Sequence, residues 1–478
     1  MAERPVLAVV GAGPAGLAAA LAAAARGVHV VLIDSAVEPG GQFYRQPARG
    51  LGARRPEALH HQWRTWERLR AGLDAHLAAG RITHLSDHHV WCLARESAGR
   101  ESGGFAVHAL LGPEQERSVE VRADGVLLAT GAYEKVLPFP GWTLPGVVTA
   151  GGAQAMLKGG LTLPGRTAVV AGTGPLLLPV ATGLAAAGAR VAALVESADP
   201  RSAVRRSRAL AAHPAKLAEA AGHAARLARH RVPVLARHTV LEAHGRDRVE
   251  SVTVAALDTD GRAVPGTERH LPCDTLAVGH GLLPHTDLAE GLGCRLDGPT
   301  VRVDEEQRTD VPGVWAAGET TGVGGAGLSL AEGHIAGRSA AAHLHGTAPD
   351  PGEWAAAARS RTRLRAFFAE LDGAYAAPVR WAERVTDATV VCRCEEVTAG
   401  AVREAVGALG AGDLRTVKLL TRAGMGWCQG RMCEPGVAGI TGCELTPARR
   451  LLARPVPLGV LAAPPDTRRR PGEPGRPQ

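Results

Sequence analysis

The chain has 478 residues, more than one hydrophobic core supports, so two to four domains are expected. The formal net charge of +7 is mild for this length, and the absence of a recognition motif argues against nucleic acid. Eight cysteines are too few for a secreted disulfide scaffold, and no apolar run reaches the roughly 20 residues of a membrane helix. We therefore expect a cytoplasmic protein without a transmembrane segment, able to associate with a membrane only through a partner.

The first motif starts at residue 6. Residues 6–10 are a continuous apolar run, typical of a buried parallel strand, and Gly11-Ala12-Gly13-Pro14-Ala15-Gly16 follows directly. An Ala-rich helix is predicted over 17–26 and a second strand over 29–33, which ends at Asp34. This order is the G-x-G-x-x-G fingerprint in its β–α–β setting, so the sequence predicts a dinucleotide site.

Each glycine of this motif has an expected role. Gly11 makes the tight turn, Gly13 lets the backbone approach a pyrophosphate, and Gly16 lets helix and strand pack closely. The start of the helix, including Pro14 and Ala15, offers free N–H groups to the phosphates. The carboxylate of Asp34 is placed to accept the ribose hydroxyls.

Three further segments bear on whether the dinucleotide is FAD or NAD. They are Gly40-Gly41-Gln42, Ala129-Thr130-Gly131, and 314–319, which ends at Gly318-Glu319. All three resemble signatures of two-dinucleotide-domain flavoproteins with the glutathione-reductase-like fold. The alternative is that these glycine clusters only form turns. The resemblance implies FAD, with an acid on the ribityl chain at a position that usually carries Asp and here carries Glu319. A Gly-rich stretch containing Ala326 then leads into a helix predicted over 327–344, whose N-terminus would favour an anionic reduced flavin.

A second, imperfect motif follows the predicted strand 167–171. It reads Gly172-Thr173-Gly174-Pro175-Leu176-Leu177, with Glu196 after the next strand, so Leu177 replaces the third glycine. A leucine there pushes the helix from the strand or crowds a pyrophosphate. We expect no NAD(P) turnover at this site, the alternative being some bound nucleotide contacted by Gly172, Gly174 and Glu196. The basic residues after it are expected on a solvated face, or else against a phosphate or partner: Arg201, Arg205, Arg206 and Arg208.

Several groups that are typical of redox enzymes are missing or isolated. Residues 1–391 contain no closely spaced cysteine pair, which makes pyridine-nucleotide disulfide reduction an unexpected activity despite the fold. Cys443 is expected to be structural, and His280 is more simply a loop polar group than part of the flavin environment. No convincing general base is apparent, so the catalytic residues are unknown and substrate chemistry is expected elsewhere.

Four cysteines near the C-terminus form the most specific pattern of the chain. Cys392 and Cys394 make a C-x-C pair, and after thirty-three residues Cys428 and Cys433 make a C-x4-C pair. Thiolates are soft ligands that suit an iron–sulfur cluster or zinc, and a one-residue gap is tight for a structural zinc knuckle. The favoured interpretation is a [2Fe–2S] cluster, with zinc or structural thiols as alternatives.

The expected architecture is α/β: a two-dinucleotide-binding-domain flavoprotein with a small α-rich iron–sulfur domain. The predicted divisions are a discontinuous FAD domain, an NAD(P)-binding-like insert, a connector, the cysteine domain and a disordered tail. Their residues are, in that order, 1–147 with 272–347, 148–271, 348–386, 387–450 and 464–478.

Nearly the whole chain resembles the large FAD subunit of heteromeric amine and amino-acid dehydrogenases. That family includes octopine and nopaline oxidase, hydrogen cyanide synthase, and hydroxyproline and proline dehydrogenase complexes. The Cys392–Thr398 and Gly426–Cys433 segments resemble its bacterioferritin-associated-ferredoxin-like domain. The resemblance implies that a smaller glycine-oxidase-like flavoprotein oxidises the substrate, and that this subunit passes the electrons through FAD and the cluster to an acceptor. The rival hypotheses are a self-contained NAD(P)H-dependent flavin reductase and a non-catalytic scaffold with a zinc-binding domain.

Overall fold

The computed structural model describes residues 4–96, 104–199, 213–445, 450 and 452–462. Its first sheet is wholly parallel, in the order β20-β7-β1-β2-β3, with β1 at the centre. The strands are β1 (Val6–Val10), β2 (His29–Ile33), β3 (Ile82–Leu85), β7 (Gly125–Leu128) and β20 (Val314–Ala316). Because the chain leaves β1 with neighbours on both sides, the loop after Val10 lies where a parallel sheet binds its ligand.

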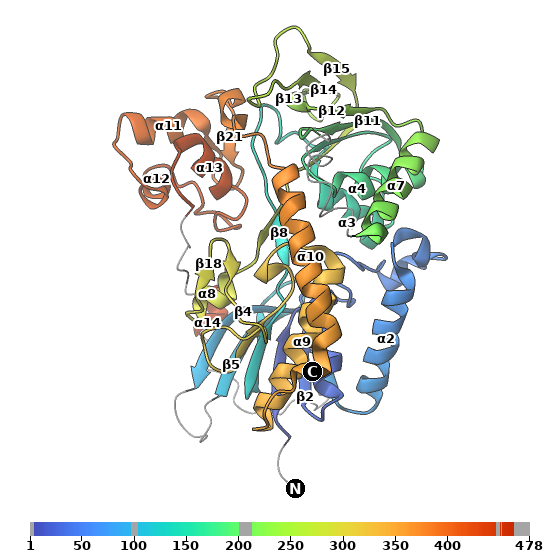
Figure 1. The fold of residues 1–478 in the computed structure, drawn as a ribbon. Coiled ribbons are helices and arrows are strands. Elements are labelled where there is room, and N and C mark those ends of the chain that lie inside the picture. The colour runs from blue at the N-terminus through green and yellow to red at the C-terminus, as the bar shows by residue number, and fades with distance from the viewer. Residues whose placement is uncertain (1–3, 97–103, 200–212, 446–449, 451, 463–478) are drawn as a thin grey trace.

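Helices cover one face of this sheet in two layers (Figure 1). The first layer holds α1 (Pro14–Ala24), α2 (Trp63–Ala78) and α9 (Gly325–Leu344), and α10 (Ala355–Ala374) packs outside α9. A Cβ on Gly333 or Gly337 would lie 2.1 or 2.3 Å from a backbone oxygen of α1, so α1 and α9 touch backbone to backbone. Trp66 of α2 is fully buried in this core, and Trp63 and Leu69 of the same helix pack against it.

The other face carries an antiparallel sheet. That sheet has the order β4-β5-β6, with β4 (His88–Glu96), β5 (Gly104–Leu111) and β6 (Arg117–Ala123). The short elements of this lobe are η1 (Arg49–Leu51), η2 (Pro56–Leu59), β8 (Ala132–Glu134), β17 (Leu282–Pro284), α8 (Asp287–Gly291), β18 (Leu296–Asp297), β19 (Thr300–Val301), η3 (Glu319–Thr321) and η4 (Pro351–Trp354).

A second parallel sheet, in the order β12-β11-β10-β16-β9, forms the upper lobe in Figure 1. Its strands are β9 (Val147–Thr149), β10 (Thr167–Gly172), β11 (Arg190–Glu196), β12 (Val234–Ala236) and β16 (Thr275–Gly279). Its helices are α3 (Ala150–Gly160), α4 (Leu177–Ala186) and α7 (Pro214–Arg229), and an antiparallel sheet of β13 (His238–His244), β14 (Ser251–Ala256) and β15 (Arg269–Pro272) completes the lobe.

The sequence division at residue 271 falls one strand early. It assigned 275–279 to the FAD domain, whereas β16 pairs with β10 on one side and β9 on the other within the second sheet. The chain returns to the first lobe only through β17, which pairs with β8. The reason is that β16 is an apolar run, a pattern that fits a central strand of either sheet equally well.

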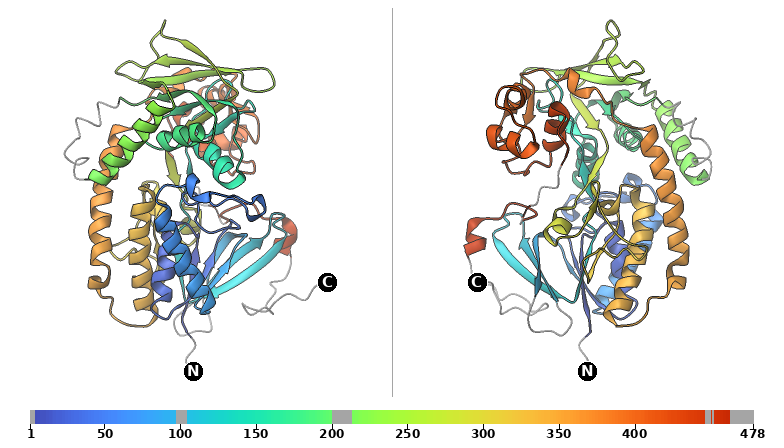
Figure 2. Two further views of the ribbon diagram at one scale, coloured as in Figure 1. Left: turned by 90° about the vertical axis from the view of Figure 1, so that its right-hand side faces the viewer. Right: turned by 60° about the vertical axis from the view of Figure 1, so that its left-hand side comes forward.

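The C-terminal part of the chain forms a small third lobe beside the second one (Figures 1 and 2). It contains η5 (Trp381–Arg384), β21 (Val390–Cys392), β22 (Val397–Thr398), α11 (Ala399–Gly407), α12 (Leu414–Thr421) and α13 (Glu434–Thr441). These elements share their own apolar core, and the chain then runs back to the first lobe, where α14 (Leu458–Ala462) lies. In the part of the chain that is described, no helix is both long and apolar enough to cross a membrane.

The third lobe is held against the second lobe by specific contacts. The indole N–H of Trp142 donates to the carbonyl oxygen of Val390 at 2.5 Å, and the Arg393 guanidinium lies 5.2 Å from the centre of that indole ring. Gly436 of α13 packs so closely on Pro138 that an added Cβ would lie 3.0 Å from its ring. The predicted tail 464–478 and the basic residues Arg201, Arg205, Arg206 and Arg208 lie outside the described residues.

Candidate cofactor sites

A cavity of about 900 Å³ opens at the carboxyl edge of the first sheet. The loop after β1, the end of β2, the loop after β7 and the start of α9 all reach it. The sequence-predicted residues that line it are Gly11, Gly13, Pro14, Ala15, Asp34, Gly41, Gln42, Thr130, Gly131, Glu319 and Ala326. Gly16 and Gly318 are not among the lining residues, and both instead allow close packing behind the cavity wall.

The first glycine loop has the shape that a pyrophosphate requires. Gly11 has φ +107°, and a Cβ there would lie 2.3 Å from the carbonyl oxygen of Ala129, so this turn needs glycine. Gly16 lies against the same turn, since its Cβ would meet the Gly11 oxygen at 1.7 Å. A Cβ on Gly13 would meet nothing nearer than Gly41 Cα at 3.9 Å. The space above Gly13 therefore belongs to the cavity, which fits a cofactor that approaches the backbone there.

Asp34 directly follows β2, and its carboxylate is turned toward the glycine loop. One carboxylate oxygen accepts from the N–H of Ala12 and the other from the N–H of Ala36, at 2.6 Å in the second case. Burial raises the pKa of this carboxyl, and the two backbone N–H groups oppose that rise. Each oxygen keeps a lone pair for a ribose hydroxyl, so the group fits the role that the sequence predicts.

Glu319 lies in the cavity wall as the first residue of η3, which precedes α9. Burial raises the pKa of its carboxyl, and the N–H of Gly325 partly offsets that rise by donating to it. The residue before it, Gly318, has φ +82°, and a Cβ there would lie 2.7 Å from the Ala15 side chain. Glycine at 318 is therefore required for the first helix and this segment to meet.

A buried acid that the motifs did not indicate supports this segment. Glu332 of α9 is fully buried, and its carboxylate accepts from the N–H of Gly318 at 3.0 Å and from the hydroxyl of Thr321 at 2.9 Å. The guanidinium of Arg365, on α10, lies 2.7 Å from the other carboxylate oxygen. Its one sequence signal is an acid within an otherwise small and apolar helix, since a buried charge needs such partners.

The second glycine motif differs from the first in where its helix begins. The α1 helix starts at Pro14, directly after Gly13, whereas α4 starts at Leu177, two residues after Pro175. Leu177 is 1% exposed and packs between α4 and the sheet, occupying the space that a third glycine would leave open. The first N–H groups of α4 are therefore displaced from the Gly172–Gly174 turn by about one helical turn.

Glu196 occupies the place that corresponds to Asp34. Its carboxylate accepts from the N–H groups of Gly174 at 3.0 Å and Ala198 at 2.8 Å. Burial raises the pKa of this carboxyl to about 7.

Connector residues lie along the same carboxyl edge of the second sheet. Ala376–Val379 share a surface hollow with Ser197 and Arg237, and Trp381 and Arg384 pack near Gly172. The Arg384 guanidinium donates to the hydroxyl of Thr239 at 3.4 Å. The connector thus covers part of the edge where a dinucleotide would bind.

The four predicted cluster cysteines come together in the third lobe. The Cys428 thiol interacts with the thiols of Cys433 and Cys394, and the Cys433 thiol interacts with that of Cys392. The hydrogen bond with Cys433 lowers the pKa of Cys428, while that contact and burial raise the pKa of Cys433.

Four thiolates fit a [2Fe–2S] cluster, in which they are divided between two irons. Gly426 lies so close to Cys394 that its Cβ would be 2.1 Å from the cysteine Cβ, so the two cysteine segments pack directly on one another.

The remaining cysteines lie apart from both sites. None of the described residues that line the flavin cavity is a cysteine, so no dithiol faces it. Cys273 and Cys294 are buried, which raises the pKa of each thiol to about 11. The Cys443 thiol donates to the carbonyl oxygen of Gly412, with 3.8 Å between sulfur and oxygen, and its backbone N–H donates to the hydroxyl of Thr441 at 3.2 Å.

The histidines that line the flavin cavity are His88, His89 and His285, and none of them is the one that the sequence singled out. His280 lies beside Thr173, 3.3 Å from its hydroxyl, and burial lowers its pKa to about 3. His285, five residues on, lines the cavity instead. The β17 strand separates the two histidines, so that one remains at the second sheet while the other reaches the first.

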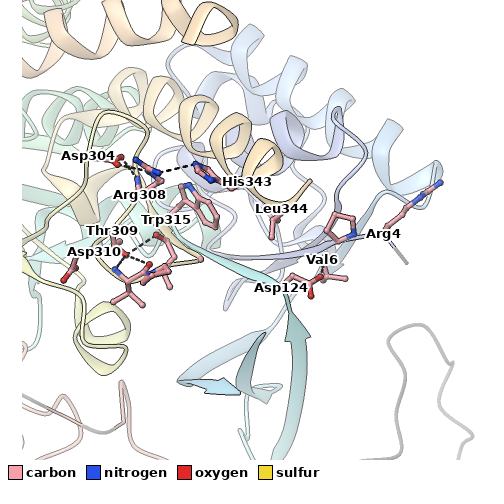
Figure 3. A pocket seen from close by; sticks show the side chains of 15 residues that line it. Arg4, Val6, Asp124, Asp304, Arg308, Thr309, Asp310, Trp315, His343 and Leu344 are labelled. Carbon is pink, nitrogen blue, oxygen red and sulfur yellow. Dashed lines mark hydrogen bonds and ion pairs between the residues drawn. The ribbon is translucent and has the colours of Figure 1, made fainter. Parts of the chain in front are cut away.

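A further cavity, of about 960 Å³, lies at the opposite edge of the first sheet (Figure 3). Its charged side chains are largely engaged with one another. The Arg308 guanidinium lies 2.8 Å from Asp304 and 3.4 Å from the His343 ring, and Asp124 accepts from the N–H of Val6. This hollow has none of the glycine turns that mark the flavin cavity.

The flavin cavity and the four-cysteine site together define the class of protein, a two-dinucleotide-domain flavoprotein that carries a [2Fe–2S] domain. The model of the pyridine nucleotide-disulphide oxidoreductase family matches residues 5–345, and that of the BFD-like [2Fe-2S] binding domain matches residues 390–441. The chain belongs to the pyridine nucleotide-disulphide oxidoreductase family and ends in a BFD-like [2Fe–2S] domain. It is an FAD-dependent oxidoreductase.

Two relatives and one solved structure give the context. The hydrogen cyanide synthase subunit HcnB of Pseudomonas aeruginosa PAO1 is 36% identical over 448 residues, which cover 90% of each chain. An opine oxidase subunit from Agrobacterium tumefaciens Ach5 is 32% identical over 486 residues, which cover 97% of this chain and 92% of the relative. The crystal structure of L-proline dehydrogenase from P. horikoshii shares the fold, with a TM-score of 0.65 at 20% identity over 96% of this chain and 80% of that one.

Proposed function

We propose that the chain is the electron-transferring subunit of a heteromeric amino-acid or opine-type dehydrogenase. Electrons enter at FAD, pass to the [2Fe–2S] cluster and leave for an external acceptor. When bound, the flavin supplies exchange between two-electron and one-electron chemistry, and the cluster carries single electrons. Substrate oxidation takes place in a smaller, glycine-oxidase-like flavoprotein partner.

One observation carries this proposal: the chain places a four-cysteine cluster site, rather than a dithiol, as the second redox centre beside its flavin cavity. The described lining of that cavity contains no cysteine, so electrons have no disulfide to reduce there. The four thiols instead lie together in the third lobe, which contacts the second lobe through Trp142 and the flavin lobe through Asp287. The HcnB and opine oxidase relatives, similar over nearly their whole length, support the same role.

A self-contained NAD(P)H-dependent reductase is not favoured. The Glu196 carboxylate is engaged by two backbone N–H groups, α4 begins late, and the connector covers part of the nucleotide edge. We propose that the second lobe takes no part in pyridine-nucleotide turnover, whether or not it retains a nucleotide.

The test is an anaerobic flavin-reduction assay on the chain alone and on the chain co-purified with a glycine-oxidase-like flavoprotein encoded beside it. We expect glycine, proline or an opine to bleach the flavin bands only in the two-component preparation. NADH and NADPH should bleach neither preparation. Rapid bleaching of the isolated chain by either nucleotide would make the reductase the better assignment. The cytoplasmic location expected from the sequence stays a prediction.

A further inference from the structure

A set of charged side chains joins the flavin lobe to the loop that carries two of the cluster cysteines. Asp287, the first residue of α8, accepts from Arg431 at 3.1 Å and from Arg450 at 2.9 Å. Arg450 also donates to Glu434 at 3.0 Å. These four residues, Asp287, Arg431, Arg450 and Glu434, are called the interdomain bridge below.

On the flavin side, the bridge is continuous with the cavity wall. His285 lines the cavity, and its Nε2 lies 3.0 Å from a carboxylate oxygen of Asp287. The carbonyl oxygen of His285 accepts from the hydroxyls of Thr130 at 2.6 Å and Thr320 at 3.1 Å. Leu288, next to Asp287, lines the same cavity. A movement of Asp287 would therefore move the wall of the flavin site.

On the cluster side, the bridge lies between the ligands themselves. Arg431 is within the loop from Cys428 to Cys433, and its guanidinium donates to the carbonyl oxygen of Cys428 at 3.2 Å. Glu434 follows Cys433 directly at the start of α13. Arg431 also donates to the carbonyl oxygen of Ala453, in the segment that returns to the flavin lobe. Both ends of the ligand loop are thereby fixed to α8.

Because the bridge residues are nearly buried, their ion pairs favour one specific arrangement of the two lobes. The side chains of Asp287, Arg431 and Arg450 are 10%, 16% and 15% exposed. Burial acts to raise the pKa of Asp287, but His285 and the two guanidinium groups hold it below its usual range. A nearly buried ion network gives little net stability, yet removing one member leaves uncompensated charge, so the two lobes have one favoured relative position.

We propose that Asp287 is a positioning residue for electron transfer, holding the Cys428–Cys433 loop at a fixed separation from the flavin through Arg431 and Arg450. This rests on the proposed function. With both groups bound, the two electrons of a reduced FAD would pass one at a time through the cluster to an acceptor of the quinone class. That acceptor would take up two protons with them, while the flavin would release its own protons to solvent.

The experiment compares Asp287→Asn with the wild type and with a matched control, Asp387→Asn. Asp387 lies in the third lobe and pairs with Arg403 at the surface, where its side chain is 77% exposed. Flavin in the purified, full-length chain is photoreduced anaerobically, and the appearance of the reduced-cluster EPR signal is timed. FAD and iron contents are measured on the same samples, and hydrogen exchange is followed over 428–434.

Asp287→Asn should keep its FAD and iron, yet its cluster should be reduced at least about tenfold more slowly, since the buried pair is broken. Hydrogen exchange over 428–434 should be faster in Asp287→Asn than in the wild type. Asp387→Asn should match the wild type both in the rate of cluster reduction and in hydrogen exchange. Asp287→Glu, which keeps the charge, should recover much of the rate.

A wild-type rate of cluster reduction in Asp287→Asn would overturn the proposal. Should that variant not fold, Arg450→Met removes the other side of the bridge without touching the flavin wall, and the same slowing is required of it. Failure of the proposed function has a different appearance, because the wild-type cluster would then stay oxidised beside a reduced flavin.

Discussion

Replacing Glu332 with glutamine tests whether a buried charge, rather than a motif residue, holds the flavin-binding segment. The Glu332 carboxylate accepts from Gly318 and Thr321 with one oxygen and pairs with Arg365 through the other, and it is wholly buried. An amide has one oxygen only, so Glu332→Gln places an NH2 group against either the backbone donor or the guanidinium.

Breaking a buried ion pair by removing one partner costs about 3–5 kcal/mol. The Arg365 side chain is 41% exposed and stays partly hydrated, so we expect the lower end, about 3 kcal/mol. The assay is urea unfolding of the flavin-free protein, combined with FAD content after gel filtration, which should also fall because Gly318 precedes Glu319 in the cavity wall.

The matched control is Glu353→Gln, which removes the partner of Arg26 and Arg338 at a more exposed site. Exposed pairs contribute about 0–1 kcal/mol, so this variant should retain its FAD and nearly all its stability. If Glu332→Gln lost no more stability than Glu353→Gln and kept its flavin, the reasoning about the buried carboxylate would be refuted.

Three further predictions concern the cofactor sites. Gly13→Val should fold with little loss of stability but retain no FAD, whereas Gly16→Val should lose both stability and FAD, because only a Cβ on Gly16 meets backbone, at 1.7 Å. Flavin absorbance measures the FAD content and thermal unfolding measures the stability. Full FAD occupancy in Gly13→Val would refute the site assignment. The pKa of Glu196 is raised from 4.5 to about 7, which means that the folded state favours the protonated carboxyl. The contribution of Glu196 to the free energy of unfolding is therefore fully present below pH 4.5 and is lost as the pH rises through 7. Urea titrations should therefore show wild type losing about 3 kcal/mol relative to Glu196→Gln between pH 4.5 and 8, and parallel pH profiles would contradict this. Cys428→Ser should keep FAD and lose electron exit, so normal turnover with a quinone or dye in that variant would exclude the cluster relay.

Local motifs carried most of what could be predicted about the flavin site. The glycine loop, Asp34 and the 314–319 segment each have a short sequence signature, because a tight turn or close backbone approach restricts the residue type. The four cysteines were equally visible, since few other functions place thiols in that spacing. Each of these signals lies within a few neighbouring residues, so it can be recognised in a single sequence.

The sequence could not predict the ion pairs between residues that lie far apart in the chain. Glu332 and Arg365 belong to different helices, and Asp287 meets Arg431 across 144 residues. An acid in an Ala-rich helix has many possible partners, and only the fold selects one. The boundary after β15 was misplaced for a similar reason, since β16 is apolar and only its neighbours show which sheet it completes. The predicted limits of the connector and of the cysteine domain stay predictions that limited proteolysis can test.

The central claim is that electrons placed on the flavin of this chain reach a [2Fe–2S] cluster held by Cys392, Cys394, Cys428 and Cys433. The most direct measurement is stepwise anaerobic photoreduction of the purified chain, followed by absorption and EPR, with flavin, iron and zinc determined on the same sample. We predict one FAD and about two irons per chain, with the reduced-cluster signal appearing as flavin is reduced. Zinc in place of iron, or iron that stays oxidised beside fully reduced flavin, would contradict the account.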